Sequence, residues 1–167
     1  KLHNKKMKKI TYLTISFILL IGINACAGYK PIFSTSNLQF EISDYSIKGD
    51  KSLGKKIYTK LYNLSQSNKN NTAVKNINIS IEVSKDKTVK VKNSAGKILE
   101  YKISLNTNIE IKDYFTNNQI LSHNFNYSSS YKTQDQFSDS LRLENKTIEN
   151  ILDKTYQDLL IEMTAAQ

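Results

Sequence analysis

Residues 77–83 read Ile-Asn-Ile-Ser-Ile-Glu-Val, and residues 99–111 read Leu-Glu-Tyr-Lys-Ile-Ser-Leu-Asn-Thr-Asn-Ile-Glu-Ile. In both stretches the odd-numbered residues are almost all apolar and the even-numbered ones are polar. Side chains alternate between the two faces of a strand, so this period of two predicts strands with one apolar face. A third strand follows the same pattern with Leu121, Phe125, Tyr127 and Tyr131. One face of the sheet therefore needs a cover.

Two amphipathic helices are the predicted cover. In the first, Leu53, Ile57, Leu61 and Leu64 recur at helical spacing, and Ser52 is the expected N-cap. The second is long, and its apolar stripe consists of Phe137, Leu141, Ile148, Ile151, Leu152, Leu159 and Met163. An alternating strand at residues 38–42, resumed after a bulge at Tyr45 and Ile47, precedes the first helix. We therefore predict an α+β fold of order β-α-β-β-β-α, with two helices on one face of a four-stranded, mainly antiparallel sheet.

The central hairpin has a predictable register. Residues that face each other must lie on the same side of the sheet, so the loop must hold an odd number of residues. Ser94-Ala-Gly96 fits as a three-residue loop, with Gly96 in the left-handed conformation. This register pairs Ile81 with Ile109 and Val91 with Leu99.

One end of this hairpin is expected to extend beyond the helices. An arm from Ile77 to Asn93 would measure about 56 Å at about 3.3 Å per residue. The helix from Phe137 to Met163 would cover only about 40 Å. The projecting end carries Lys85, Lys87, Lys90, Lys92 and Lys97.

Composition limits the possible functions. The chain has 24 basic and 15 acidic residues, an excess of nine basic residues. Five of the lysines lie within the first nine positions, so the excess of basic over acidic residues in the remainder of the chain is only four. This mild excess does not indicate a nucleic-acid-binding surface. After position 26 there is no cysteine and only one histidine, His123. These residues are too few to build a catalytic triad or a zinc site. His123 is expected to be a half-buried structural residue, and the sequence predicts no enzyme and no cofactor.

The N-terminal segment is typical of a targeting signal followed by a membrane anchor. Basic residues precede the apolar run 10–23, which is short for a spanning helix and of the length usual in a signal peptide. The run ends in Ile23-Asn-Ala-Cys26, which resembles the lipobox of bacterial lipoproteins. We predict a signal peptide at residues 1–25 (with Met7 as the true start), a lipidated Cys26 and tether at 26–37, and one domain at 38–167. The alternative is ordinary cleavage after Ala25, leaving a free thiol.

The mature chain resembles the lipopolysaccharide-assembly lipoprotein family (LptE) in its shorter form. The likeness rests on Cys26-Ala-Gly-Tyr-Lys-Pro-Ile-Phe33, on Gly96-Lys-Ile-Leu-Glu-Tyr-Lys-Ile-Ser-Leu105, and on the long final helix. The resemblance implies two helices on a four-stranded sheet, and a plug and assembly factor within an outer-membrane β-barrel partner (LptD-like) that delivers lipopolysaccharide. Ala27 after the cysteine implies an anchor in the outer membrane, on its periplasmic side. An auxiliary lipoprotein of an ABC-type lipid transporter is the alternative function.

Two surfaces are candidate binding sites. Lys85, Lys87, Lys90 and Lys92 could bind the phosphates and carboxylates of lipopolysaccharide, or they could be solvated charges that guard a strand edge. The even-numbered sheet face, rich in Asn and Ser, could hydrogen-bond the polar interior of a barrel or could simply face solvent. Tyr101, Tyr127 and Tyr131 are either partner anchors or core residues with a hydrogen-bonded edge.

Overall fold

The computed structural model describes residues 38–67 and 74–166. They form, in order, β1 (Phe40–Gly49), α2 (Lys51–Ser67), β2 (Lys75–Lys92), β3 (Ile98–Asp113), β4 (Gln119–Lys132) and α3 (Phe137–Ala165). This is the predicted order of strands and helices. The predicted signal peptide, the lipidated Cys26 and the tether lie outside the described residues. None of the described helices combines the length and the apolar character needed to cross a membrane.

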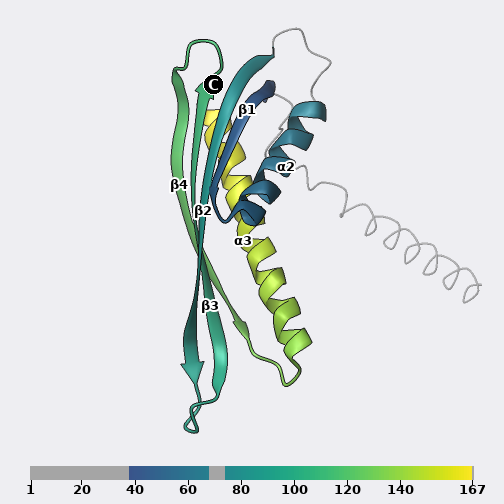
Figure 1. Ribbon diagram of the computed structural model, residues 1–167, viewed down its shortest axis with the longest axis vertical. Helices are drawn as coiled ribbons and strands as arrows, with labels where there is room; N and C mark the ends of the chain where they lie inside the picture. Colours follow the sequence, from purple (N-terminus) through teal and green to yellow (C-terminus); the bar gives the residue numbers. More distant parts are fainter. Residues whose placement is uncertain (1–37, 68–73, 167) are drawn as a thin grey trace, which may run out of the picture. The chain divides into compact units, whose positions relative to one another are not determined.

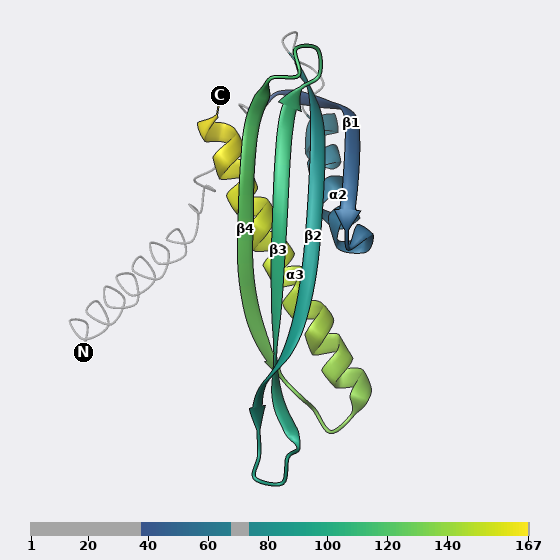
Figure 2. The ribbon, with the colours of Figure 1, turned by 60° about the vertical axis from the view of Figure 1, so that its left-hand side comes forward.

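The four strands form one sheet in the order β1-β2-β3-β4. β1 runs parallel to β2, and the pairs β2–β3 and β3–β4 are antiparallel. Both helices lie on the same face of this sheet, as Figure 1 and the turned view in Figure 2 show. The predicted α+β fold, with a mainly antiparallel sheet covered on one side, is confirmed.

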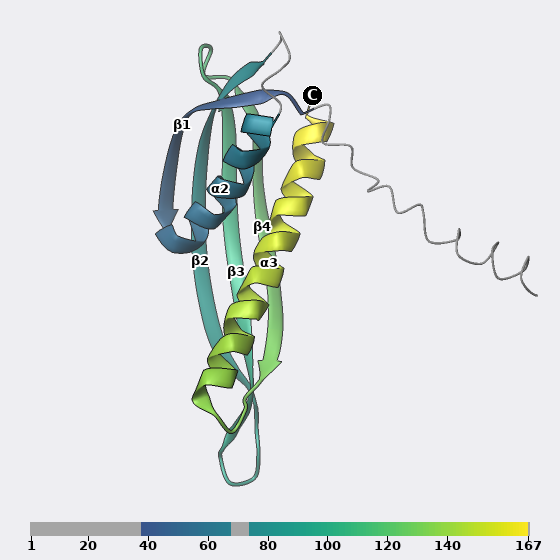
Figure 3. The same cartoon turned by 90° about the vertical axis from the view of Figure 1, so that its right-hand side faces the viewer.

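The core lies between this sheet face and the helices. Its centre is made by odd-numbered residues of β2 and β3, such as Ile79, Ile81, Leu105 and Ile109, which are at most 1% exposed. In Figure 3 the two helices lie in front of the strands and cover them from this side. Ion pairs Lys56–Glu149 and Lys60–Asp153 link α2 to α3 along their exposed sides. The alternation of apolar and polar residues in the sequence therefore reflects the burial of the odd-numbered side chains under the helices.

The connection from β1 to α2 is a sharp turn at Gly49. This residue has a φ of +71°, in the left-handed region that glycine adopts without steric cost. The next residue, Asp50, donates its backbone N–H to the carbonyl of Val83 at 2.7 Å, and its Oδ1 accepts the N–H of Leu53 at 3.2 Å. Asp50 is therefore the N-cap, and the prediction of Ser52 is wrong because α2 begins at Lys51, two residues before the start that Ser52 would cap.

The register of the β2–β3 hairpin agrees with the prediction over most of its length. Ile81 pairs with Ile109, and Gly96 has a φ of +80°. The predicted pairing of Val91 with Leu99 is wrong, because a local irregularity places Val91 opposite Glu100 before Lys92 returns to Ile98. The tip of the hairpin lies beyond the end of β4 and the start of α3 (Figures 1 and 3), as expected.

The first turns of α3 depart from the predicted buried stripe. Phe137 is 81% exposed and Leu141 is 44% exposed, whereas Ile148, Ile151 and Leu159 are buried. The reason is the sheet beneath: the residues of β2 past Val83 are all exposed, and Lys87 replaces an apolar partner there. The apolar stripe begins to pack only where it meets the buried part of the sheet.

Candidate functional site

The sheet face opposite the helices is lined mainly by polar side chains. Even-numbered residues face this side, and the register places like residues beside one another, such as Asn106 with Asn126 and Ser104 with Ser128. No described helix or strand covers this face (Figure 2). Its central members are Asn76, Asn78, Ser80, Glu82, Ser84, Lys102, Ser104, Asn106, Asn108, Glu110, Ser122, Asn124, Asn126, Ser128 and Ser130. We call these residues the polar face.

The polar face offers donors and acceptors with little net charge. Amides and hydroxyls each present both functions, so they can pair with the polar groups of a partner without the desolvation cost of a charge. A pocket of about 330 Å³ lies here, between Glu82, Asn106, Asn108 and Asn124. Such a surface fits a polar protein wall that supplies complementary hydrogen bonds.

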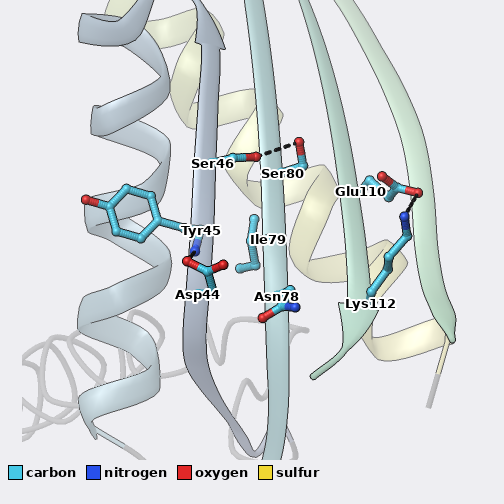
Figure 4. Close-up of a pocket in the computed structure, with 8 residues that line it drawn as sticks. All are labelled: Asp44, Tyr45, Ser46, Asn78, Ile79, Ser80, Glu110 and Lys112. Atoms are coloured by element: carbon cyan, nitrogen blue, oxygen red, sulfur yellow. Dashed lines mark hydrogen bonds and ion pairs between the residues drawn. The ribbon is translucent and has the colours of Figure 1, made fainter. Parts of the chain in front are cut away.

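A smaller pocket of about 130 Å³ lies where the β1 bulge meets β2 and β3 (Figure 4). The hydroxyl of Ser46 donates to that of Ser80 at 3.0 Å, and Lys112 pairs with Glu110 at 2.9 Å. Between these pairs, Oδ1 of Asn78 is buried without a hydrogen-bond partner in the described part of the chain. No cluster of three or more His, Cys, Asp or Glu able to hold a metal ion occurs within residues 38–67 and 74–166.

The four candidate lysines separate into two groups in the structure. Lys87 and Lys90 each contact a carboxylate of the chain itself, at 2.5 Å from Glu144 and 2.7 Å from Glu100. Lys85 and Lys92 are exposed and form no ion pair with a described residue. The lysines also lie on different faces, because Lys85 and Lys87 have the parity of the core while Lys90 and Lys92 have that of the polar face. Whether any of them binds a ligand stays a prediction.

Lys87 is held by an ion pair and two aromatic rings. Its Nζ lies 4.4 Å from the ring centre of Tyr101 and 5.6 Å from that of Tyr131, whose hydroxyl donates to Glu144 at 2.8 Å. Desolvation favours the neutral amine of Lys87 and so lowers its pKa. The hydrogen bonds and the electrostatic attraction from Glu144 and Tyr131 outweigh this effect, so the pKa of Lys87 is raised overall. Desolvation likewise opposes ionisation of Glu144, yet the hydrogen bonds from Lys87 and Tyr131 lower its pKa. The arrangement fixes α3 to the hairpin.

Lys90 lies on the polar face. Its Nζ contacts both Oε1 of Glu100 and the hydroxyl of Ser130, at 3.1 Å from the latter. The hydrogen bond from Lys90 is the main cause that lowers the pKa of Glu100. An anionic ligand at Lys90 would therefore compete with a carboxylate already in place, whereas Lys92 at the tip has no such competitor among the described residues.

A pocket beneath the hairpin was not predicted from the sequence. It measures about 420 Å³ and is lined by Lys87, Tyr101, Tyr131, the first turns of α3 and the connection at 133–135. The signal available in the sequence was Glu144, a carboxylate at an inward position of the final helix, and Phe137 at its start. Neither could be placed beside Lys87 without the tertiary fold.

The predicted structural residues lie close to where they were expected. His123 is half-exposed, with its ring 4.4 Å from that of Phe125 and its Nδ1 3.9 Å from Glu162. Tyr131 is buried, and the hydroxyl of the partly buried Tyr127 donates to Asp158, which raises the pKa of Tyr127 to about 12. Tyr127 and Tyr131 are therefore core residues with a hydrogen-bonded edge, and the partly buried Tyr101 stacks on Tyr131 with ring centres 5.8 Å apart.

Solved structures similar to this domain include those of bacterial lipoproteins. Rare lipoprotein B from Shewanella oneidensis superposes with a TM-score of 0.50 at 13% identity, covering 74% of this chain and 94% of that one. An uncharacterized lipoprotein B from Nitrosomonas europaea gives a TM-score of 0.54 at 15% identity, covering 80% and 88%. The described domain has the fold of these lipoproteins.

The similarity is one of fold at these identities. No family model matches the sequence, and no curated protein matches it. The similarity extends over most of both neighbouring chains. The fold thus agrees with the sequence features that predict a lipoprotein.

Proposed function

We propose that this chain is a lipid-anchored subunit of the outer-membrane machinery that transports and assembles lipopolysaccharide. In this role it is a non-enzymatic plug and assembly factor for a β-barrel partner, on the periplasmic side of the membrane. The observation that carries the proposal is the polar face: a wide sheet surface of Asn and Ser that no described element of the domain covers. The lipoprotein fold and the lipobox-like Ile23-Asn-Ala-Cys26 support it.

The dimensions of the domain restrict the barrel that could hold it. Four strands spaced about 4.8 Å apart, with a helical layer about 10 Å away, give a cross-section near 20 Å once side chains are included. Barrels of 16–18 strands enclose a channel, and those of about 22 strands hold a folded plug. The partner is therefore expected to have more than about 20 strands, with a polar interior that pairs with the polar face.

The test is capture of the partner from membranes. We expect affinity-tagged protein, extracted in mild detergent, to bring down one large outer-membrane β-barrel. Recovery of inner-membrane ATPase components in place of a barrel would support the ABC-transporter alternative and reject this proposal.

A substitution on the polar face identifies the docking surface. Asn126 is exposed on the polar face, midway along the edge strand β4, so Asn126→Lys should leave the thermal midpoint unchanged. It places an unpaired charge in the proposed interface, and barrel capture should fall by about tenfold or more. The matched control is Asn150→Lys, the same change at an exposed position of α3. Equal loss of capture with both variants would show that the polar face is not the specific contact.

Lipopolysaccharide contact is tested at the tip of the hairpin. Lys92 is exposed and has no ion pair with a described residue, so Lys92→Glu should weaken binding to purified lipopolysaccharide by about threefold to tenfold without changing the thermal midpoint. Lys146→Glu, on the exposed side of α3, makes the same change in net charge and should bind like the unmodified protein. Unchanged binding by Lys92→Glu would remove the hairpin from the proposal.

A further inference from the structure

The turn between β3 and β4 exposes two aromatic rings side by side. Phe115 is 76% exposed and Tyr114 is 47% exposed, and their ring centres lie 5.3 Å apart at an angle of 83°. Large apolar side chains at this exposure usually mark a contact when they are grouped. The function proposed above makes no use of them.

The turn holds these rings in one conformation. Oδ1 of Asp113 accepts the N–H of Phe115 at 3.0 Å, and both the N–H and the hydroxyl of Thr116 at 2.8 and 3.0 Å. The backbone N–H of Asp113 also donates to the carbonyl of Asn118 at 2.9 Å. These bonds from Thr116 and Phe115 lower the pKa of Asp113, so the carboxylate that organises the turn stays charged. Phe115 is therefore presented to its surroundings by a preformed turn, with little ordering cost on binding.

The turn lies at the end of the domain where the chain enters from Cys26. Lys75 donates its N–H to Gln39 at 3.3 Å, and the next residue, Asn76, accepts the N–H of Tyr114 at 3.0 Å. Gln39 and Tyr114 are thus two strand spacings apart, or about 10 Å. Figures 1 and 2 show the start of β1, the β3–β4 turn and the end of α3 at this same end.

The length of the intervening chain brings the turn within reach of the bilayer. Eleven residues separate Cys26 from Leu38, and they span at most about 40 Å when extended. The opposite end of the domain, at the tip of the β2–β3 hairpin, is about 60 Å farther along the strands. A lipid on Cys26 would therefore leave the aromatic turn within reach of the membrane surface.

We infer that the Tyr114–Phe115 turn is a membrane contact, with its rings at the headgroup level of the bilayer that carries the anchor. The inference rests on the lipidation of Cys26 in the proposed function. Aromatic side chains favour this interfacial layer, and the exposed Lys75 beside the turn adds attraction to anionic headgroups. Two rings bind a bilayer weakly by themselves, but the anchor raises their effective concentration there. The contact orients the domain, so that the tip of the hairpin points away from the membrane leaflet.

The absence of tryptophan from the chain allows a direct test. Phe115→Trp gives a single fluorescent reporter in the turn, and Phe137→Trp gives a matched reporter, 81% exposed, at the start of α3. Each lipid-bearing protein is purified from membranes and reconstituted into vesicles of phosphatidylethanolamine and phosphatidylglycerol that contain brominated acyl chains. We expect about a twofold loss of fluorescence for Phe115→Trp, with a blue shift, and none for Phe137→Trp.

Three results would overturn the inference. They are quenching of neither reporter, equal quenching of both, and a blue shift at position 115 that appears only when the barrel partner is added. The last would make the turn a protein contact. A preparation whose Cys26 thiol is free by mass spectrometry also overturns it, because the turn then has no anchored bilayer to meet. Barrel capture is measured separately on the same variants: capture without quenching rejects only the membrane contact, and quenching without capture rejects only the barrel partner.

Discussion

At the scale of single residues, the interactions of Lys87 are determined by side chains that are distant in the sequence. In the sequence it is one of four lysines on an expected projecting hairpin, and a ligand-binding role is a natural hypothesis. In the structure its ammonium group contacts Glu144 from α3 and lies over the rings of Tyr101 and Tyr131. The lysine that breaks the apolar pattern of β2 is therefore satisfied within the domain, because α3 places a carboxylate opposite it.

This ion pair predicts a pH-dependent contribution to stability. The pKa of Glu144 is lowered from 4.5, so its contribution is present above about pH 4.5 and is lost as the pH falls through the lower folded value. The pKa of Lys87 is raised from 10.5, so its contribution persists up to that pH and is lost above it. Glu144→Gln should reduce the free energy of unfolding at pH 7 by about 1 kcal/mol, a modest value because Lys87 remains 36% exposed.

Urea denaturation at pH 7 and at pH 3 measures this difference. The difference between Glu144→Gln and the unmodified protein should be smaller at pH 3 than at pH 7, because a carboxyl group whose pKa is lowered on folding loses its contribution to stability as the pH falls below the unfolded value of 4.5. Glu149→Gln, which breaks the more exposed pair with Lys56, is the control and should change stability by less than about 0.5 kcal/mol. A pH-independent loss in Glu144→Gln would show that packing, not charge, holds this contact.

At the scale of elements, the connection from β1 to α2 decides which side of the sheet is covered. After β1 the chain turns and enters α2, which runs back over the core face of the sheet. The chain then enters β2, which is parallel to β1. Gly49 makes this possible by adopting a positive φ directly against the backbone of Val83. Asp50 then satisfies the first turn of α2. Two adjacent residues thus set the direction of the crossover.

Gly49→Ala should be among the most destabilising single substitutions in the domain. A Cβ at this position would meet the carbonyl oxygen of Val83 at 2.1 Å, which is backbone and cannot move aside. We expect a loss of about 3 kcal/mol or more in the free energy of unfolding, from the clash and the left-handed backbone together. Thermal and urea denaturation measure it.

Gly96→Ala provides the matched control for that substitution. Gly96 has a similar φ of +80°, but nothing lies within 4 Å of the added Cβ. Only the cost of the left-handed conformation remains, about 1 kcal/mol. If the two variants lose equal stability, the contact with Val83 is not the cause of the larger effect.

At the scale of the whole molecule, the domain is built to leave one sheet face bare. Both helices pack on the odd-numbered side and are tied to each other by Lys56–Glu149 and Lys60–Asp153. The other side presents amides and hydroxyls in register across β2, β3 and β4. In the proposed function, this surface binds the partner through hydrogen bonds, and the lipid on Cys26 determines which membrane the protein occupies.

The anchor itself gives the prediction at this scale. Cys26→Ser removes the sulfur that would carry the lipid, and the mature protein should move from the outer-membrane fraction to the soluble periplasmic fraction. Fractionation with immunodetection measures this change. Ser34→Ala, within the predicted tether, is the control and should stay with the membrane. If Cys26→Ser remains in the membrane fraction when the leader has been removed, an acyl anchor is not what holds the protein there.

The class of fold, the order of its elements and most of the core could be predicted from the sequence alone. This was possible because burial under a helical layer imposes a period of two on Ile77–Val83 and a helical period on residues 53–64, and both are local patterns. The register at Ile81 and the conformation of Gly96 followed from the same alternation. These features depend on residues close together in the chain.

The tertiary structure alone decided how distant residues meet. Glu144 lies 57 residues from Lys87, and no periodicity links them, so the pairing that occupies this candidate lysine was invisible in the sequence. The exposure of Phe137 and Leu141 depended on where the sheet beneath α3 ceases to be apolar. The proximity of the Phe115 turn to the entry of the chain depended on strand order. Each is a contact between elements, and contacts between elements are set by three-dimensional packing.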